Sequence, residues 1–425
     1  MYKRQSGRLG TVEIAAVVLG DGLFFGALTL GFGLLLGIDP LMAQALGDER
    51  PADAHRFYRE ACILSCILFL PFTGILYLVY AVSMNAAAVE PQTDLATGLY
   101  LFARGLSVLP FFLGGVYRSY LQAHEITRPI LWSTVLVNIF NVPADYLLGF
   151  GDRALTEIGL PAIGLGDGFG VLGIGAASTM VTLIQAIYLW NAIRKQTRTF
   201  EPQPTTLEGM KRICVVGLPV GLHWLVEMGI FVTVAVVMAA ISTAAAGGHQ
   251  VAMTLSSFTF VMCLGLSTTA SVRVGHAVGR GDQEGVRRAA WVSTTYTVAF
   301  MACCALVFTS FPGPLSRFLA TTSDVIDIAI VLVGIAAVFQ VVDGLQVVMA
   351  GCLRGAGDTR SPFIANLVGH WFIGLPIGCY LAFQADYGPP GLWLGLTVGL
   401  TFSAFALLFR FVTLSRKPIQ DLENH

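Results

Sequence analysis

Charged residues are scarce in this chain of 425 residues. They make up 12% of the sequence, whereas hydrophobic residues make up 55%. Because soluble domains carry about 25% charged residues, so low a content argues against a soluble protein and for one embedded in a membrane. The net charge is −1 and no block of Lys and Arg occurs, so nothing indicates a nucleic-acid partner.

Motifs that carry enzymatic or metal chemistry are also missing. No Cys-x-x-Cys pair occurs, and the eight cysteines lie in apolar stretches, so we interpret them as small buried hydrophobic residues. No phosphate-binding loop of the form GxxxxGKS or GxxxxGKT is present. His124-Glu125 begins like a zinc-protease motif, but Arg128 stands where the second histidine is needed. We therefore expect neither an enzyme nor a resident cofactor.

Long apolar runs dominate instead and predict an all-α integral membrane protein. About 20 apolar helical residues cross the hydrocarbon core of a bilayer. By this measure we predict eleven spans, at 11–38, 60–80, 96–123, 129–150, 170–193, 213–241, 247–272, 291–311, 325–352, 362–384 and 391–414. A polar stretch with two prolines separates five spans from six. The predicted domains are therefore an N-terminal lobe, a linker, a C-terminal lobe and a tail, at 1–194, 195–210, 211–418 and 419–425.

Basic residues are distributed unevenly over the predicted loops. One set of alternate loops holds nearly all of them, whereas the other set holds only Arg153 and Arg317. The positive-inside rule then places the linker and the C-terminus in the cytoplasm. The same rule leaves Lys3, Arg4 and Arg8 on the outside, which conflicts with it.

A repeat resolves this conflict. The matching pairs are Ala45-Leu46-Gly47 with Ala277-Val278-Gly279, Thr127-Arg128 with Thr359-Arg360, and, shifted by one residue, Pro129 with Pro362 and Pro143 with Pro376. One shared register in separate loops predicts two parallel repeats related by an axis along the membrane normal. In that register the counterpart of span 213–241 falls mostly before residue 1. We therefore expect the first helix of the N-terminal half to be absent from this chain.

The motifs of both halves resemble the multidrug and toxic compound extrusion (MATE) transporters, most closely their NorM-like branch. The matching stretches are Gly37-Ile38-Asp39-Pro40, Ala43-Gln44-Ala45-Leu46-Gly47, His249-Gln250-Val251-Ala252, Arg273-Val274-Gly275-His276, Asp343-Gly344-Leu345-Gln346 and Leu353-Arg354-Gly355. The resemblance implies a twelve-helix fold of two bundles around a central cleft, here five helices plus six. It further implies an antiporter that exports organic, often cationic, compounds in exchange for Na⁺ or H⁺.

The resemblance also sets the expected surroundings of the protein. We expect a monomeric, multi-pass protein of a plasma membrane, such as a bacterial inner membrane, with small organic compounds and membrane lipid as its partners. A lipid-linked saccharide flippase of the same superfamily is the alternative. Such a flippase would be expected to have a more cationic cavity, and few Lys or Arg lie in the middle of these spans.

Two carboxylates lie deep inside predicted spans, Glu227 in 213–241 and Asp343 in 325–352. A charge at that depth costs about 2.5–3.5 kcal/mol, and neither span holds a Lys or Arg to pair with it. Loss of water disfavours the ionised carboxyl group, so either residue could exchange a proton, while the ionised form offers oxygen ligands to Na⁺. We predict that both residues bind the coupling cation, with Na⁺ as the candidate metal ion.

Five further polar residues complete the predicted sites. His223 lies one helical turn before Glu227 and is expected to line the same cavity. By the resemblance, Gln250 opens the eighth family helix and lines the cavity. Asn141 and Asp145 resemble an Asn-x-x-x-Asp pair of proton-coupled members, with Asp145 as a further cation-coupling residue. Ser178 is their candidate polar partner from the next span.

Two other features have simpler interpretations. Gly164-Leu165-Gly166-Asp167 reproduces the GxGD motif of intramembrane aspartyl proteases, which need a second aspartate on a facing helix. Here the motif lies in a Gly-rich predicted loop, where a turn explains it better, so an intramembrane hydrolase is the weaker alternative. Arg104, near the end of its predicted span, is expected to reach the membrane interface with its long side chain.

Overall fold

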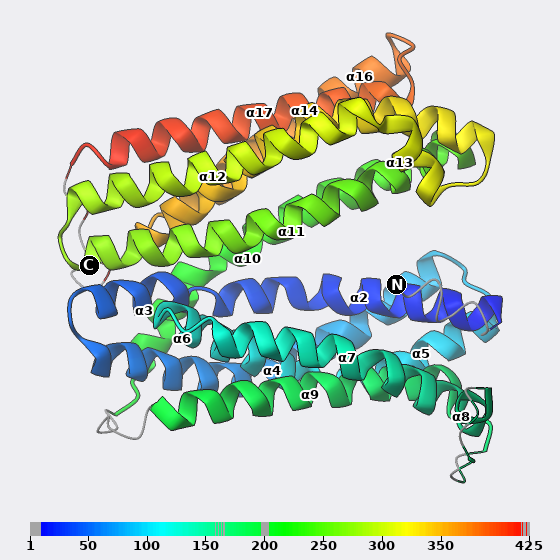
Figure 1. Cartoon of the computed structure of the whole chain (residues 1–425), viewed down its shortest axis with the longest axis horizontal. Helices are drawn as coiled ribbons and strands as arrows, with labels where there is room; N and C mark the ends of the chain where they lie inside the picture. The colour runs from blue at the N-terminus through cyan, green and yellow to red at the C-terminus, as the bar shows by residue number, and fades with distance from the viewer. Residues whose placement is uncertain are drawn as a thin grey trace. The chain divides into compact units, whose positions relative to one another are not determined.

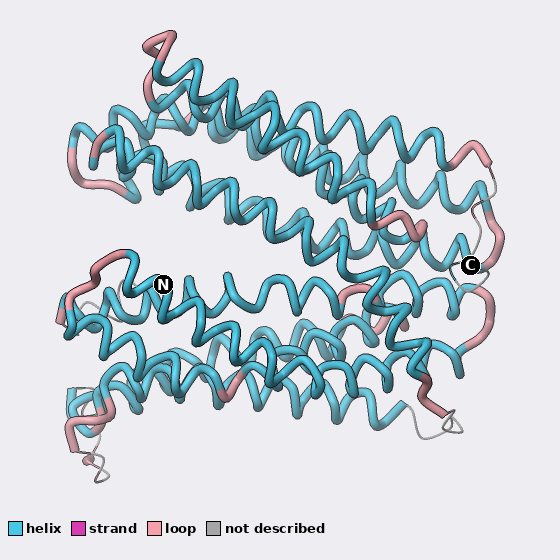
Figure 2. The backbone as a smooth tube through the Cα atoms, turned by 180° about the vertical axis from the view of Figure 1, so that it is seen from behind, coloured by secondary structure: helices cyan, strands magenta, loops and turns pink. Residues whose placement is uncertain are grey.

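The computed structural model describes residues 10–157, 159, 161–162, 164, 166–196, 204–417, 419 and 422. Throughout these residues every regular element is a helix and no strand occurs (Figures 1 and 2). Within the described residues ten helical segments are long and apolar enough to cross a membrane, with α2 (Thr11–Leu35) and α3 (Ile38–Gly47) counted together as one segment. An eleventh span results if α5 (Pro91–Gly105) and α6 (Val108–Ala123), which meet at a bend of 48°, are counted as one. The prediction of an all-helical membrane protein is confirmed.

The helices form two compact units. Unit 1 contains the described residues of Met1–Ile38 and His55–Cys214, and unit 2 contains those of Asp39–Ala54 and Val215–His425. Most of α3 (Ile38–Gly47) therefore belongs to unit 2, although it is far in sequence from the rest of that unit. The Gln44 side chain of α3 is fully buried and donates a hydrogen bond to the Gly355 carbonyl at 2.9 Å, which explains this assignment.

Unit 1 is built from helices whose ends follow simple local rules. Its members are α2 (Thr11–Leu35), most of α4 (Pro51–Ala86), α5, α6, α7 (Arg128–Phe150), α8 (Asp152–Glu157), α9 (Gly170–Gln196) and the start of α10 (Leu207–Ile241). Pro91 and Pro129 stand in the first turns of α5 and α7, where a missing N–H costs nothing. α9 packs against α5, α6 and α7, and Gly173 lets its backbone approach the Leu148 carbonyl of α7 closely.

Unit 2 is arranged around one central helix, α14. The unit comprises the rest of α10, α11 (Thr243–Gly279), α12 (Gln283–Ser310), α13 (Pro312–Leu319), α14 (Ser323–Gly355), α15 (Arg360–Asn366), η3 (Leu367–Gly374), α16 (Leu375–Phe383) and α17 (Pro389–Leu414). α14 packs against α11, α12 and α17. The helices α15, η3 and α16 follow one another without a break, and η3 is a π-helix. This span therefore changes its helical register in its middle.

Small residues bring the last two spans of unit 2 into close contact. A side chain at Gly395 of α17 would overlap the backbone of Gly378 in α16. A side chain at Gly399 would overlap the carbonyl of Gly369 in η3. Such glycine contacts let helix backbones approach one another where lipid provides no hydrophobic driving force for association.

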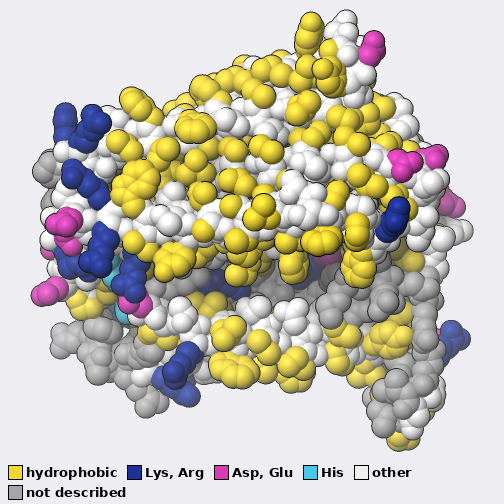
Figure 3. All heavy atoms as spheres, turned by 45° about the horizontal axis from the view of Figure 1, so that its top comes forward, with side chains coloured by type: hydrophobic (Ala, Val, Ile, Leu, Met, Phe, Trp, Pro, Cys, Tyr) yellow, Lys and Arg dark blue, Asp and Glu magenta, His cyan; other side chains and the backbone are white. Residues whose placement is uncertain are grey.

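The outer surface of the helices is rich in large apolar side chains. Phe258, Phe318 and Phe409 expose 83%, 85% and 74% of their surfaces. On the face shown in Figure 3, hydrophobic side chains cover most of the visible helices, while Lys and Arg gather mainly at one end. Apolar patches of this extent are rare on soluble monomers, so the surface is suited to contact with lipid.

Candidate functional site

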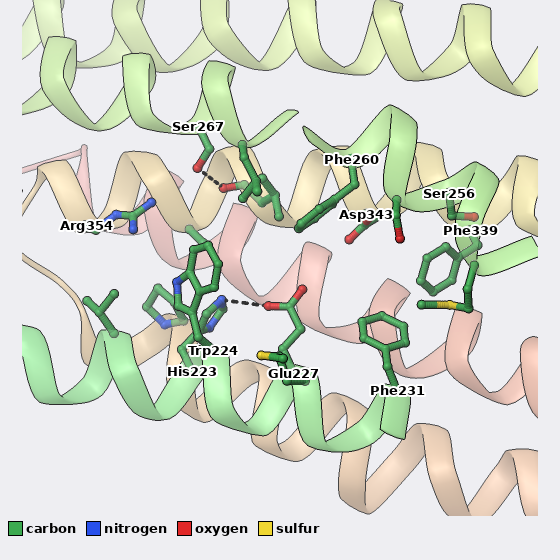
Figure 4. A pocket seen from close by; sticks show the side chains of 18 of the residues that line it. His223, Trp224, Glu227, Phe231, Ser256, Phe260, Ser267, Phe339, Asp343 and Arg354 are labelled. Atoms are coloured by element: carbon green, nitrogen blue, oxygen red, sulfur yellow. Dashed lines mark hydrogen bonds and ion pairs between the residues drawn. The ribbon is translucent and has the colours of Figure 1, made fainter. Parts of the chain in front are cut away.

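A cavity of about 240 Å³ lies inside unit 2, between α10, α11 and α14. Most of its lining is apolar and aromatic, with Trp224, Phe231 and Phe260 among the side chains that face it (Figure 4). Charged or titratable groups also line it: Glu227 and His223 from α10, and Asp343 and Arg354 from α14. An apolar pocket with a few convergent polar groups is the usual form of a site for small organic molecules.

The two carboxylates selected from the sequence meet in this cavity. Asp343 is 6% exposed, and the Glu227 side chain is 14% exposed. Figure 4 shows their carboxyl groups pointing into the same space from different helices. They are close enough for their charges to act on each other. Two like charges in a water-poor space are stable only if they share a proton, a cation or water.

His223 lies against Glu227, as their one-turn spacing predicts. Its Nε2 atom is 3.3 Å from Glu227 Oε2, and its side chain is 10% exposed (Figure 4). The histidine therefore lines the cavity beside one carboxylate and engages one of its oxygens. The other carboxylate oxygen of Glu227, Oε1, faces the rest of the cavity.

Two amide residues that the sequence analysis did not select complete this group. Gln346 of α14 and Asn366 at the end of α15 are both fully buried. The Asn366 Nδ2 atom is 3.4 Å from Glu227 Oε2, and the Gln346 Nε2 atom is 2.9 Å from Asn366 Oδ1. Gln346 belongs to one of the stretches that carry the family resemblance. Asn366 had only the weaker signal of a polar residue within an apolar span.

The π-helix η3 adds a second histidine to this region. His370 is fully buried, and neither ring nitrogen has a hydrogen-bond partner among the described residues. Its electrostatic partners are Glu227 and His223. Trp371, the next residue, donates from Nε1 to the Val226 carbonyl at 3.1 Å and so ties η3 to α10. π-Helical turns often occur at functional sites, and this one lies beside the carboxylate pair.

Gln250 is placed differently from these residues. Its side chain is exposed, and Nε2 donates to Thr254 Oγ1 of the same helix at 3.4 Å. It does not line the cavity that holds Glu227 and Asp343. The structure thus brings together three of the four residues predicted for the C-terminal lobe and leaves Gln250 outside the group.

Unit 1 holds a separate buried polar cluster. Asp145 of α7 is 4% exposed, and neither carboxylate oxygen has a hydrogen-bond partner within the described ranges. Its electrostatic partners are Asp21 of α2 and Arg104 of α5. Ser178 is also buried without a partner for its hydroxyl group in the described part of the chain, and Asn141 is half-buried. No side-chain hydrogen bond joins either of these last two residues to Asp145 in the described structure.

Arg104 corrects one expectation, because its side chain is buried among helices of unit 1 and is not extended outward. It is 8% exposed, and its guanidinium group lies 4.2 Å from the centre of the Phe24 ring. Nη1 donates to Ser107 Oγ at 3.1 Å, and Nε is 3.8 Å from Asp21 Oδ1. The break between α5 and α6 places Ser107 beside it, and α2 supplies the carboxylate. A rule that considers one helix at a time could not detect these partners.

The described residues of the GxGD segment, Gly164, Gly166 and Asp167, lie exposed in bends or turns. The Asp152 carboxylate accepts hydrogen bonds from the backbone N–H groups of Gly164 and Gly166, at 3.2 and 2.9 Å. Asp167 pairs with Arg153 at 3.0 Å, and both side chains are largely exposed. An aspartate in this position cannot serve intramembrane hydrolysis, which needs two facing carboxyl groups.

The donor atoms of the cavity fit a proton or a small hard cation. Within the described residues no group of three or more His, Cys, Asp and Glu side chains could hold a metal ion. The oxygen donors of the cavity include the carboxylates of Glu227 and Asp343 and the hydroxyl of Ser256, which is buried without a hydrogen-bond partner in the described structure. Oxygen donors of this kind suit Na⁺ better than a transition metal.

The sequence matches a known family model and named relatives. The family model MatE matches residues 5–147 and 219–380. A probable multidrug resistance protein NorM of Mesorhizobium japonicum is 33% identical, over 96% of this chain and 88% of the relative. A protein of the same name from Agrobacterium fabrum is 31% identical, over 97% and 89%.

Solved structures show the same fold. The eukaryotic MATE transporter AtDTX14 aligns with a TM-score of 0.84 at 17% identity, over 99% of this chain and 93% of that one. The Vibrio cholerae MATE transporter VcmN in its bent form aligns with a TM-score of 0.85 at 16% identity, over 98% and 91%.

Proposed function

Because the chain belongs to the multidrug and toxic compound extrusion family, we propose that it is a secondary active antiporter that exports small organic compounds in exchange for Na⁺ or H⁺. The family consists of transporters, so the chain is not an enzyme. One observation carries the proposal: Glu227 and Asp343 line one apolar cavity inside unit 2. An intramembrane ionisable residue marks an ion or substrate pathway by default.

The cavity chemistry favours cationic or neutral substrates over anionic ones. Of the described residues that line it, Glu227 and Asp343 carry carboxylates, and Arg354 is the one Lys or Arg. The aromatic side chains offer apolar surface and the negative faces of their rings, which attract organic cations. A saccharide flippase with an anionic lipid carrier would need the opposite balance of charge.

Antiport follows if the carboxylates have two alternative occupants. A cation bound at Glu227 and Asp343 neutralises the site and stabilises one conformation of the carrier, and the substrate stabilises the other. In parallel-repeat transporters the two lobes rock against each other around a fixed site. The inward gradient of the cation then resets the carrier after the substrate has left. Asp145 is proposed to take part in the same cycle from the N-terminal lobe.

The proposed setting is a bacterial inner membrane, with the linker 195–210 and the C-terminus in the cytoplasm. The gathering of Lys and Arg on alternate loops supports this orientation. We propose that the protein acts as a monomer, because each unit already contains its own buried charged cluster. Cysteine labelling of Arg416→Cys, at an exposed position just after α17, from each side of the membrane and compared with the unsubstituted chain, would test the orientation.

Proteoliposomes test the proposed function directly. The purified full chain is reconstituted, a fluorescent organic cation is loaded, and Na⁺ and H⁺ gradients are imposed separately. We expect efflux under at least one gradient and none in protein-free liposomes. Absence of efflux under both gradients, with the protein inserted and folded, would overturn the proposal.

A further inference from the structure

A chain of buried hydrogen bonds joins Glu227 to the helix that carries Asp343. It starts at Glu227 of α10, passes through Asn366 at the end of α15 and ends at Gln346 of α14. Both amide residues are fully buried. Gln346 lies three residues after Asp343, so the two side chains occupy neighbouring positions on one helix. Two polar contacts thus connect three spans around the carboxylate pair.

The chemistry of the groups fixes the direction of this chain. An ionised carboxylate only accepts hydrogen bonds, so Asn366 must present its NH₂ group to Glu227. Its Oδ1 atom then faces Gln346, which must present its own NH₂ group. The hydrogen bonds thereby hold each of the two amide groups in one orientation. Turning either amide group by half a turn would bring two acceptor oxygen atoms against each other.

A contact between η3 and α10 also helps to hold Asn366 in place. The π-helix η3 begins at the next residue, and Trp371 of η3 is bonded to the Val226 carbonyl, one residue before Glu227. The Asn366 amide therefore approaches the carboxylate from a helix that is itself attached to α10. Glu227 Oε2 receives both Asn366 and His223, and no described residue donates to Oε1.

From this arrangement we propose that Asn366, held by Gln346, is a positioning residue that orients the Glu227 carboxyl group for the coupling cation. The inference rests on the antiport function proposed above. Asn366 binds one carboxylate oxygen and directs the other into the cavity that Asp343 shares. Gln346 acts through Asn366 and links this orientation to α14. Groups that orient a ligand of an ion are typically worth about 10- to 100-fold in its affinity.

Matched amide-to-leucine variants test the proposal in the full chain. Asn366→Leu and Gln346→Leu remove the two links. Gln340→Leu is the control, because Gln340 lies on the same helix and is equally buried, but bonds to Thr259 outside the cavity. Efflux from proteoliposomes is measured against the concentration of the driving cation and, separately, against the concentration of the organic substrate.

We expect the half-maximal cation concentration to shift about tenfold in Asn366→Leu and Gln346→Leu. The shift is upward for Na⁺, whose oxygen ligand is no longer oriented, and downward for H⁺, because the ionised carboxylate loses a donor. The half-maximal substrate concentration should stay within about twofold of wild type. The double variant should shift no further than Asn366→Leu, because both changes remove one linked contact.

Three outcomes would overturn the inference: no shift in either variant, an equal shift in Gln340→Leu, or additive shifts in the double variant. If Asn366→Leu does not fold, Gln346→Leu keeps Asn366 in place, and calorimetric titration of the purified protein with NaCl or acid gives the same comparison. Failure of the wild-type protein to export under either gradient would instead overturn the proposed function. The two failures are therefore distinguishable.

Discussion

The two units neutralise their buried carboxylates in opposite ways. In unit 1 the guanidinium group of Arg104 lies within electrostatic reach of both Asp21 and Asp145. In unit 2 the groups that touch Glu227 are a histidine and a neutral amide, and an open cavity separates it from Asp343. Unit 1 thus holds an arginine beside its carboxylates, whereas Arg354, which lines the cavity of unit 2, has Asp39 and not Glu227 or Asp343 as its acidic electrostatic partner. On this contrast we propose that the exchangeable cation binds in unit 2.

Neutralising the carboxylates of unit 2 should have the largest effect on transport. Glu227→Gln or Asp343→Asn removes the charge while nearly preserving the side-chain volume. We expect cation-driven efflux to fall by about 100-fold or more, because the coupling cation loses a primary ligand. Proteoliposome efflux measures the loss, and circular dichroism checks that the helices remain. Normal pumping by both variants would refute the comparison.

Removing the internal cation of unit 1 should mainly affect stability. Arg104→Met leaves the buried Asp145 and the partly exposed Asp21 without a compensating basic group, and the loss of one partner of a buried ion pair costs about 3–5 kcal/mol. We expect a clear drop in the thermal unfolding temperature of the detergent-solubilised protein. Arg317→Met, at an exposed site on α13, serves as the control and should change it little. Equal stability of the two variants would show that Arg104 does not balance this cluster.

Asp145→Asn tests whether unit 1 also takes part in coupling. Because Arg104 already lies near this carboxylate, we expect a reduction of efflux of about tenfold or less, smaller than that in Glu227→Gln. The same liposome assay under both gradients gives the comparison. A loss as complete as that in Glu227→Gln would show that the two units share the coupling step equally.

Changes at His223 should have the smallest effect among these residues. His223→Phe keeps a ring in the cavity but removes the 3.3 Å contact to Glu227 Oε2. Asn366 still donates to that oxygen, so we expect efflux to fall by about three- to tenfold. His223→Gln, which can donate in place of the imidazole, should retain more activity than His223→Phe. The reverse order would argue that the ring, and not its hydrogen bond, matters.

Most of the fold could be predicted from composition and apolar run length alone. Helices such as α10 and α14 match predicted spans, because a membrane leaves a helix as the simplest way to satisfy the backbone. The bend between α5 and α6 and the π-helix η3 were not predictable in this way. Both occur inside apolar runs, where helix register depends on packing against neighbouring helices and not on local sequence.

The sequence by itself determined that Glu227 and Asp343 are buried and costly, because an isolated carboxylate in a 20-residue apolar run has no local partner. It also determined the contact between His223 and Glu227, since one helical turn separates them. Only the tertiary structure decided that Asn366 and Gln346 join this pair, and that Gln250 does not. Those contacts connect residues on different helices, and no periodicity within one helix encodes them. The same holds for Arg104, which is buried because α2 supplies the carboxylate that one helix alone could not provide.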